Sequence, residues 1–153
     1  MPRSEFRREL TVTASPEQTW KTLTDVPLLV SWVSIVEDAT EIEPLGRYTA
    51  VLMDRLGPFK LRADLDIVIT DVVPGESLVV KASGEDRQVG SRLTIEASMA
   101  IEPRQPEGSV VRFSGVYEVT GRVASMGPGT INKKADKIMA EFFSAAEAAL
   151  GTA

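Results

Sequence analysis

The sequence predicts an α+β fold in which a curved antiparallel sheet wraps around one long C-terminal helix. From Ile35 to Thr120, apolar and polar residues alternate almost throughout, with short turns between the runs. This pattern is typical of an antiparallel meander with one covered face and one solvated face. After residue 127 the apolar residues recur every three or four positions, as they do along one side of a helix. Two short helices are expected between the first strand and the meander.

The first strand is predicted over residues 5–14, where apolar residues alternate with charged and polar ones. Ser15 then has the side chain of a helix N-cap, and Pro16 suits the first helical position. A short helix should follow. Pro27 can open a second short helix that runs through Trp32.

Turn residues divide the meander into strands that each direct one row of side chains inward. Turns are predicted at Gly57-Pro58 and Pro74-Gly75, and a polar loop at residues 103–108. The predicted inward rows are Tyr48, Ala50, Leu52, Asp54 and Leu56; Phe59, Leu61, Ala63, Leu65, Ile67 and Ile69; Leu78, Val80 and Ala82; Leu93, Ile95, Ala97, Met99 and Ile101; and Val111, Phe113, Gly115, Tyr117 and Val119.

The C-terminal helix is predicted to follow residues 127–129 and to extend for roughly 22 residues, or about 33 Å. Its apolar stripe should cover the inner face of the sheet, with Phe143 at the edge of the stripe. Lys133, Lys134 and Lys137 are expected on the solvated side of the helix. The stripe comprises Ile131, Ala135, Ile138, Met139, Phe142, Ala146 and Leu150.

Composition excludes several classes of function. The chain has 153 residues, no His and no Cys, so Ser-His-Asp and Cys-His catalysis and zinc-thiolate sites are excluded. A net charge of -5 argues against binding to nucleic acid, which needs a basic surface. No cofactor or metal site is predicted. The charged N-terminal segment lacks the apolar run of a signal peptide, so a cytoplasmic location is expected.

A sheet curved around a single helix leaves part of its concave face uncovered, and the uncovered part becomes an apolar cavity for a small ligand. Small side chains in the inward rows, including Gly115, leave volume unfilled. The alternative is that the same apolar residues simply fill a core. The candidate ligand-binding residues are Trp32, Leu52, Asp54, Leu56, Phe59, Leu61, Met99, Phe113, Tyr117, Met126, Ile138, Met139 and Phe142.

Two of these candidates are polar. The alternation points Asp54 into the cavity, where it could orient a ligand or act as a weak general base. A register slip near the Gly57-Pro58 turn would instead leave Asp54 in solvent. Of the two positions, the one in solvent is favoured. Tyr117 could donate to a ligand carbonyl, but a buried tyrosine bonded to the backbone is the favoured alternative. Asp64 and Asp66 are expected on the solvated outer face.

Four short motifs add a resemblance to this interpretation. They are Leu56-Gly57-Pro58-Phe59-Lys60, Gly90-Ser91, the segment from Gly121 to Gly127 (GRVASMG) and Phe142-Phe143. With the order of the elements, they resemble the family of the carbon monoxide dehydrogenase G subunit, a branch of the START-like (SRPBCC) helix-grip superfamily. The resemblance implies that residues 1–153 form one START-like ligand-binding domain.

The same resemblance implies a non-catalytic accessory protein of a molybdenum-containing carbon monoxide dehydrogenase. Its cavity would bind an apolar small molecule such as a quinone or lipid, and the protein would contact the inner face of the membrane peripherally. Two features depart from the family. The chain ends at Ala153 without the tail of longer members, and Trp32–Glu37 lacks their Cys and Pro-Gly turn.

Two other functions remain open from the sequence. One is a polyketide cyclase- or hydrolase-like enzyme of the same superfamily, which would use Asp54 and Tyr117. The absence of His and of paired carboxylates disfavours it. The other is an interaction module that works through its surface and has only a vestigial cavity.

Overall fold

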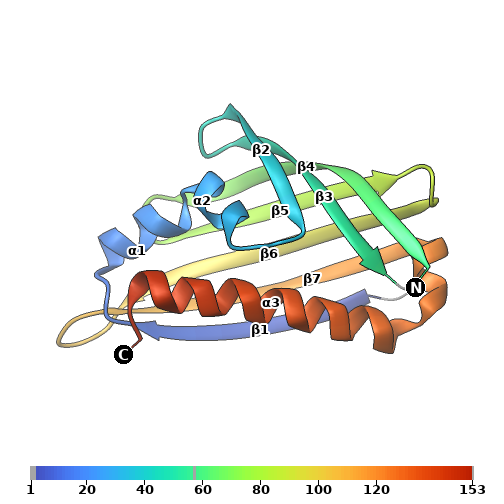
Figure 1. Ribbon diagram of the computed structural model, residues 1–153. Coiled ribbons are helices and arrows are strands. Elements are labelled where there is room, and N and C mark those ends of the chain that lie inside the picture. The colour runs from blue at the N-terminus through green and yellow to red at the C-terminus, as the bar shows by residue number, and fades with distance from the viewer. Residues whose placement is uncertain (1–2, 57, 153) are drawn as a thin grey trace.

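The computed structural model describes residues 3–56 and 58–152 and has the predicted α+β architecture (Figure 1). In chain order the elements are β1 (Arg3–Val12), α1 (Pro16–Leu23), α2 (Val26–Ser31), β2 (Val36–Glu43), β3 (Arg47–Leu56), β4 (Phe59–Val73), β5 (Ser77–Asp86), β6 (Ser91–Pro103), β7 (Ser109–Gly121), the 3₁₀ helix η1 (Arg122–Met126) and α3 (Pro128–Leu150).

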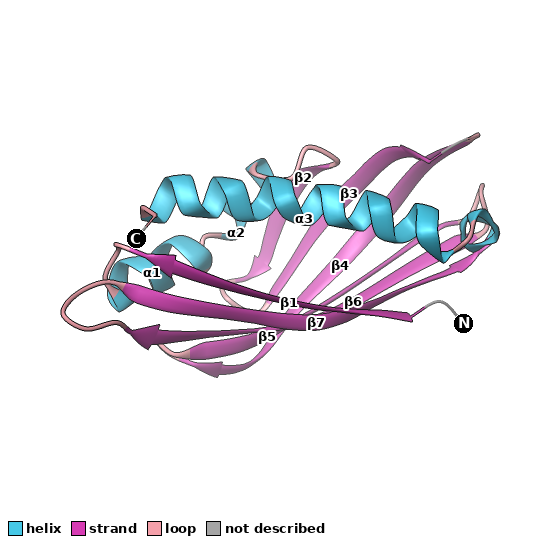
Figure 2. Ribbon diagram, turned by 90° about the horizontal axis from the view of Figure 1, so that it is seen from below, coloured by secondary structure: helices cyan, strands magenta, loops and turns pink. Residues whose placement is uncertain are grey.

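The strands form one antiparallel sheet, and α3 lies across its inner face. The strand order is β1-β7-β6-β5-β4-β3-β2, so β2 to β7 form the predicted meander and β1 pairs with the last strand. Figure 2 shows α3 as a separate layer along one side of the sheet. The helix-grip arrangement predicted from the sequence is therefore confirmed.

Three irregularities in the strand pairing accompany the curvature of the sheet. The pairing of β2 with β3 shifts between Glu37 and Thr40 and again between Glu41 and Glu43, and that of β4 with β5 shifts between Thr70 and Val73. The first and the last of these shifts each contain an aspartate with positive φ, 56° at Asp38 and 52° at Asp71. An extra residue in one strand bends it and increases its twist, so these bulges help the sheet to curve around the helix.

Side-chain caps start both short helices at the predicted places. The Ser15 hydroxyl accepts a hydrogen bond from the Gln18 amide at 3.2 Å. The Asp25 carboxylate accepts one from the Leu28 amide at 3.3 Å, with Pro27 in the first turn. Each cap satisfies an N–H group that would otherwise lack a helical partner.

The first strand ends at Val12, two residues earlier than predicted, because the next two amides bond to the end of α3. The Thr13 N–H donates to the Gly151 carbonyl at 2.9 Å, and the Ala14 N–H donates to the Leu150 carbonyl at 3.0 Å. These bonds join β1 to the C-terminal end of α3 and satisfy one of the carbonyls that a helix end leaves unpaired.

The hydrophobic core lies at the end of the sheet covered by the C-terminal half of α3. Phe143, Ala146 and Leu150 are buried there against residues of the sheet and of both short helices. Phe143 is only 4% exposed, so its predicted place at the edge of the stripe is wrong. It follows Met139 by four positions and precedes Ala146 by three, which puts it on the buried side of the helix. Phe142 is partly buried.

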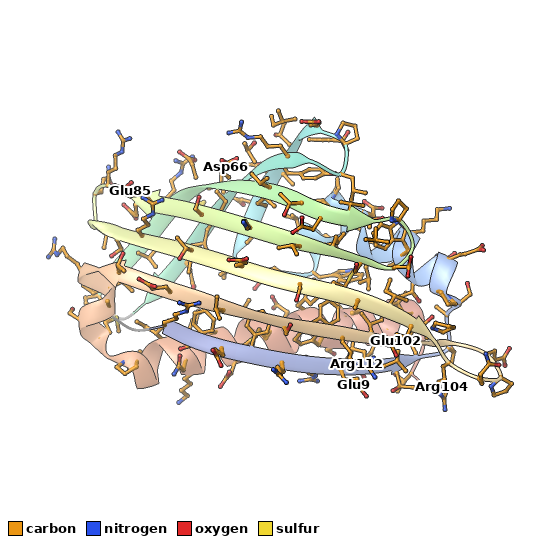
Figure 3. The ribbon with its side chains drawn as sticks, turned by 180° about the vertical axis from the view of Figure 1, so that it is seen from behind. Glu9, Asp66, Glu85, Glu102, Arg104 and Arg112 are labelled. Atoms are coloured by element: carbon orange, nitrogen blue, oxygen red, sulfur yellow. The ribbon has the colours of Figure 1, made fainter. Side chains whose placement is uncertain are left out.

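The outer face of the sheet carries charged side chains, as the alternation predicts (Figure 3). Arg112 of β7 pairs with Glu9 of β1 at 3.1 Å and with Glu102 of β6 at 2.6 Å. Asp66 pairs with Arg47 at 2.9 Å. Exposed pairs of this kind contribute little to stability, so the fold depends mainly on the packing of the inner face.

Truncating Phe142 and Phe143 separately should show which of these adjacent residues belongs to the packed core. Phe143→Ala removes a fully packed ring and should lower the free energy of unfolding by about 3 to 5 kcal/mol. Phe142→Ala, the matched control, should cost clearly less because that ring is only partly buried. Urea unfolding of both variants measures the difference. Equal costs, or a larger cost at position 142, would contradict this account of the core.

Candidate functional site

A cavity of about 360 Å³ lies between the sheet and the N-terminal half of α3. Its size falls at the lower end of the range for small-molecule sites, about 300 to 1,000 Å³. The predicted cavity is thus present, although it is partly open rather than enclosed. Its wall is predominantly apolar and comprises Phe6, Val33, Ile35, Val36, Leu52, Asp54, Leu61, Ala63, Leu65, Ala82, Gly84, Asp86, Ser91, Arg92, Leu93, Ile95, Tyr117, Val119, Val123, Ile131, Lys134, Ala135, Ile138 and Met139.

Small side chains keep this end of the sheet hollow. Ala63, Ala82 and Gly84 on the sheet and Ala135 on α3 all belong to the wall. At Gly84 a Cβ atom would lie 2.6 Å from a methyl carbon of Leu65, so any larger residue would displace that side chain. The volume that bulky residues fill at the core end is left empty here.

Gly115 makes room for an aromatic ring of the wall. A Cβ atom at this position would lie 2.8 Å from the tip of the Phe6 ring. The same Cβ atom would lie even closer to the Glu96 carbonyl oxygen of the neighbouring strand. Since no real Cβ contact is that short, only a glycine fits between the backbone of β6 and the Phe6 ring.

Six of the predicted ligand-binding residues lie on the wall: Leu52, Asp54, Leu61, Tyr117, Ile138 and Met139. Trp32, Met99, Phe113 and Phe142 instead belong to the core or pack against it. Phe59 stacks beneath Arg122, and neither Phe59 nor Met126 lines the cavity. The side chain of Leu56 lies outside the described part of the structure. Binding of a ligand by the six wall residues remains a prediction.

An aromatic cluster explains why several candidates are absent from the wall. Phe142 contacts Trp32 at a centroid distance of 5.6 Å and Phe113 at 6.2 Å, both edge to face. Phe113 also lies 5.1 Å from Phe143. These rings contact one another favourably and fill the space between the core and the cavity. They therefore belong to the packed core and not to the wall of the cavity.

Several wall residues were missing from the predicted set. Leu65, Leu93 and Val119 were in the predicted inward rows, so the alternation carried the signal that could have identified them. Val33 and Ile35 precede β2 in a segment without regular periodicity. This segment is held near α3 by a hydrogen bond of 2.7 Å from the Ser34 amide to the Glu141 carboxylate.

Asp54 and Lys134 form an ion pair between β3 and α3 at the cavity. Lys134 Nζ lies 3.0 Å from Asp54 Oδ1, and the two side chains are 26% and 12% exposed. Asp54 therefore faces inward, which corrects the favoured expectation that it lies in solvent. Lys134 was expected on the solvated side of the helix, and this too is wrong. It follows Ile131 by three positions and precedes Ile138 by four, so it lies on the inner side.

Tyr117 is satisfied by a side chain and not by the backbone. Its hydroxyl donates to Asn132 Oδ1 at 2.7 Å, and the Ser4 hydroxyl donates to the same oxygen at 2.7 Å. The favoured expectation of a backbone partner is therefore wrong. Asn132 connects α3 with β7 and β1, so the phenol of Tyr117 holds the helix in place beside the cavity.

Asp86 is a buried carboxylate that organises the turn between β5 and β6. It accepts hydrogen bonds from the amides of Arg62, at 2.8 Å, Gln88 and Val89, both at 3.0 Å. The bond from Arg62, reinforced by those from Val89 and Gln88, lowers the pKa of this carboxyl against the opposing effect of desolvation. Asp86 is 6% exposed and serves a structural role at the far wall.

A second depression, of about 550 Å³, lies on the opposite face of the sheet and is lined largely by polar and charged side chains such as Lys81, Glu96 and Glu118. It lacks the apolar wall of the first cavity. Within residues 3–56 and 58–152, no helix is long and apolar enough to cross a membrane. The same residues include no group of three His, Cys, Asp or Glu side chains placed to bind a metal ion.

The curved sheet, the crossing helix and the apolar cavity define a START-like helix-grip protein. A conserved protein from Geobacillus kaustophilus has this fold, with a TM-score of 0.81, 21% identity and coverage of 97% of this chain and 94% of that one. A START superfamily protein from Mycobacterium smegmatis aligns with a TM-score of 0.63 at 12% identity, covering 93% and 92% of the two chains.

The di-domain ARO/CYC protein StfQ from the steffimycin biosynthetic pathway aligns with a TM-score of 0.65 at 14% identity, covering 97% of this chain and 50% of StfQ. Among curated protein sequences, none matches this one significantly. The sequence profile of the carbon monoxide dehydrogenase G subunit (CoxG) matches residues 9–151, and the chain belongs to that family.

The hydrogen bonds that Asp86 accepts should make the free energy of unfolding depend on pH. Its pKa is lowered from 3.8 in the folded state, so the folded protein takes up this proton less readily than the unfolded chain. The resulting stabilisation is complete above the ordinary pKa and is lost as the pH falls through the lower folded value. At pH 7, Asp86→Asn should cost about 1.5 to 3 kcal/mol.

The measurement is urea unfolding of the wild type and the variant between pH 7 and pH 3. The difference between them should stay constant down to about pH 5 and shrink below about pH 4. The exposed Asp64→Asn, whose side chain is 84% accessible, is the control and should show little difference at any pH. A constant penalty for Asp86→Asn over the whole range would contradict the assignment.

Proposed function

We propose that this protein is a non-catalytic accessory protein that binds an apolar small molecule, a quinone or a lipid-like compound, in the cavity beneath α3. The observation that carries the proposal is the cavity of about 360 Å³ with its predominantly apolar wall. Burial of apolar ligand surface would supply most of the affinity, at roughly 25 cal/mol per Å² before the costs of association.

Membership of the CoxG family supports a partnership with a carbon monoxide dehydrogenase. A carrier for an electron-accepting quinone would suit an oxidising enzyme, because reduced and oxidised quinones are both apolar and could occupy the same cavity. The cavity supports the binding role, and the family name supports the choice of partner. Native mass spectrometry of gently purified protein tests whether a small molecule remains bound.

The polar groups of the cavity support binding rather than catalysis, because other side chains already engage them. Asp54 is engaged by Lys134 at 3.0 Å, and Tyr117 donates its proton to Asn132 at 2.7 Å. A general base must reach the proton that it removes, and a general acid must direct its own proton to the substrate. Both groups instead connect α3 to the sheet. Conversion of a bound quinone or polyketide by the wild type would contradict the non-catalytic role.

Filling the cavity should weaken ligand binding without unfolding the protein. Ala135 lies on the wall, so Ala135→Phe places a ring in the ligand's space and should weaken binding of a naphthoquinone probe by about tenfold or more. Ala140→Phe adds the same ring to an exposed position of the same helix and should bind like the wild type. Quenching of tryptophan fluorescence by the probe gives the dissociation constants, and circular dichroism verifies folding. Equal binding by both variants would contradict the proposed site.

A further inference from the structure

We infer that the cavity selects neutral apolar ligands and rejects anionic ones, with Asp54 as the residue that determines this specificity. The inference rests on the proposed function, since it defines the ligand class of the same cavity. It follows from the charges of the wall. Asp54 and Asp86 contribute two carboxylates, and Lys134 contributes an ammonium group that Asp54 already neutralises.

Arg92, the fourth charged residue of the wall, does not change the net charge of the groups that face inward. Arg92 is exposed and alternates along β6 with Ser91 and Leu93, whose side chains are more buried and belong to the inward side. Asp86 keeps its charge through three amide donors. The inward-facing charges of the described wall therefore sum to a negative value, which repels an anion.

The ion pair belongs to the wall of the cavity. Asp54 comes from the end of β3 and Lys134 from the second turn of α3, so the pair spans the space between sheet and helix. Asp54 Oδ1 also accepts a hydrogen bond from the Arg55 amide at 2.7 Å. With only 12% of the Asp54 side chain exposed, water screens the pair weakly, and its attraction exceeds that of a surface pair.

A fatty-acid carboxylate in this cavity would have to take Lys134 away from Asp54. Asp54 would then remain as a largely buried charge without its cation, which is strongly unfavourable. A quinone, an alcohol or an ester carries no charge, and it can occupy the apolar part of the cavity while the ion pair stays intact. If the ligand carboxylate were instead buried beside the intact ion pair, no free cation would compensate its charge. This arrangement is also unfavourable.

The test compares two ligands with the same number of carbon atoms and different polar ends, neutral 1-decanol and anionic decanoate, at pH 7.5. Calorimetric titration of the wild type should show 1-decanol binding about tenfold or more tightly than decanoate. In Asp54→Asn the ammonium of Lys134 becomes available to the ligand. The affinity for decanoate relative to that for 1-decanol should then rise by about tenfold.

Two variants serve as controls. Asp64→Asn makes the same change in net charge on the outer face, where the side chain is 84% exposed, and should leave both affinities at wild-type values. The double variant Asp54→Asn/Lys134→Met removes both charges of the pair. Its affinity for decanoate relative to that for 1-decanol should not rise as it does in Asp54→Asn. That result would show that the ammonium group of Lys134 causes the gain in the single variant.

Three results would overturn the inference while leaving the proposed function intact. They are equal binding of decanoate and 1-decanol by the wild type, an unchanged affinity for decanoate relative to 1-decanol in Asp54→Asn, and an equal gain in Asp64→Asn. Failure of the wild type to bind either 1-decanol or a naphthoquinone would overturn the proposed function itself. If Asp54→Asn does not fold, the wild-type comparison and the double variant decide the question.

Discussion

The packing of the C-terminal half of α3 against one end of the sheet determines the rest of the structure. Phe143, Ala146 and Leu150 are buried in the core, and backbone hydrogen bonds join the end of the helix to the residues after β1. At the other end, the Val123 amide of η1 donates to the buried Ser91 hydroxyl at 2.9 Å. The helix is thus held at both ends, and the space beneath its N-terminal half is where the sheet curves away from it.

Polar side chains keep this hollow part of the molecule stable without filling it. Asn132 accepts hydrogen bonds from Ser4 and Tyr117, and Lys134 reaches Asp54 on the opposite side of the helix. An apolar cavity loses the dispersion contacts that a packed core would have. Interactions around its wall offset part of this loss, so stability and an unfilled volume coexist in the same fold.

The sequence predicted the architecture because its signals are periodic. Alternation along the strands, the three-and-four spacing of α3, the cap at Ser15 and the start of a second helix near Pro27 are local patterns, and the structure follows them. The cavity was predicted from the same architecture. Its wall was predicted only in part, because alternation distinguishes the inner face from the outer face but does not distinguish the packed end of a strand from its hollow end.

Two other errors concern α3, where the helical spacing carried the correct signal. Lys134 was assigned to solvent because lysine is usually exposed, although its spacing from Ile131 and Ile138 puts it on the inner side of the helix. Phe143 was assigned to the edge of the stripe, although its spacing from Met139 and Ala146 puts it on the buried side. The spacing does not reveal the partner on the sheet, Asp54, that pairs with Lys134.

The pairing of β1 with β7 has a consequence for biosynthesis. β1 leaves the ribosome roughly one hundred residues before its partner β7, a delay of about 5 to 20 s at typical rates of translation. Until then one edge of β1 and its apolar side chains lack their native neighbours, and contacts so distant in sequence form slowly. The nascent chain should therefore depend on chaperones that protect its N-terminal segment until the last strand and α3 have been synthesised.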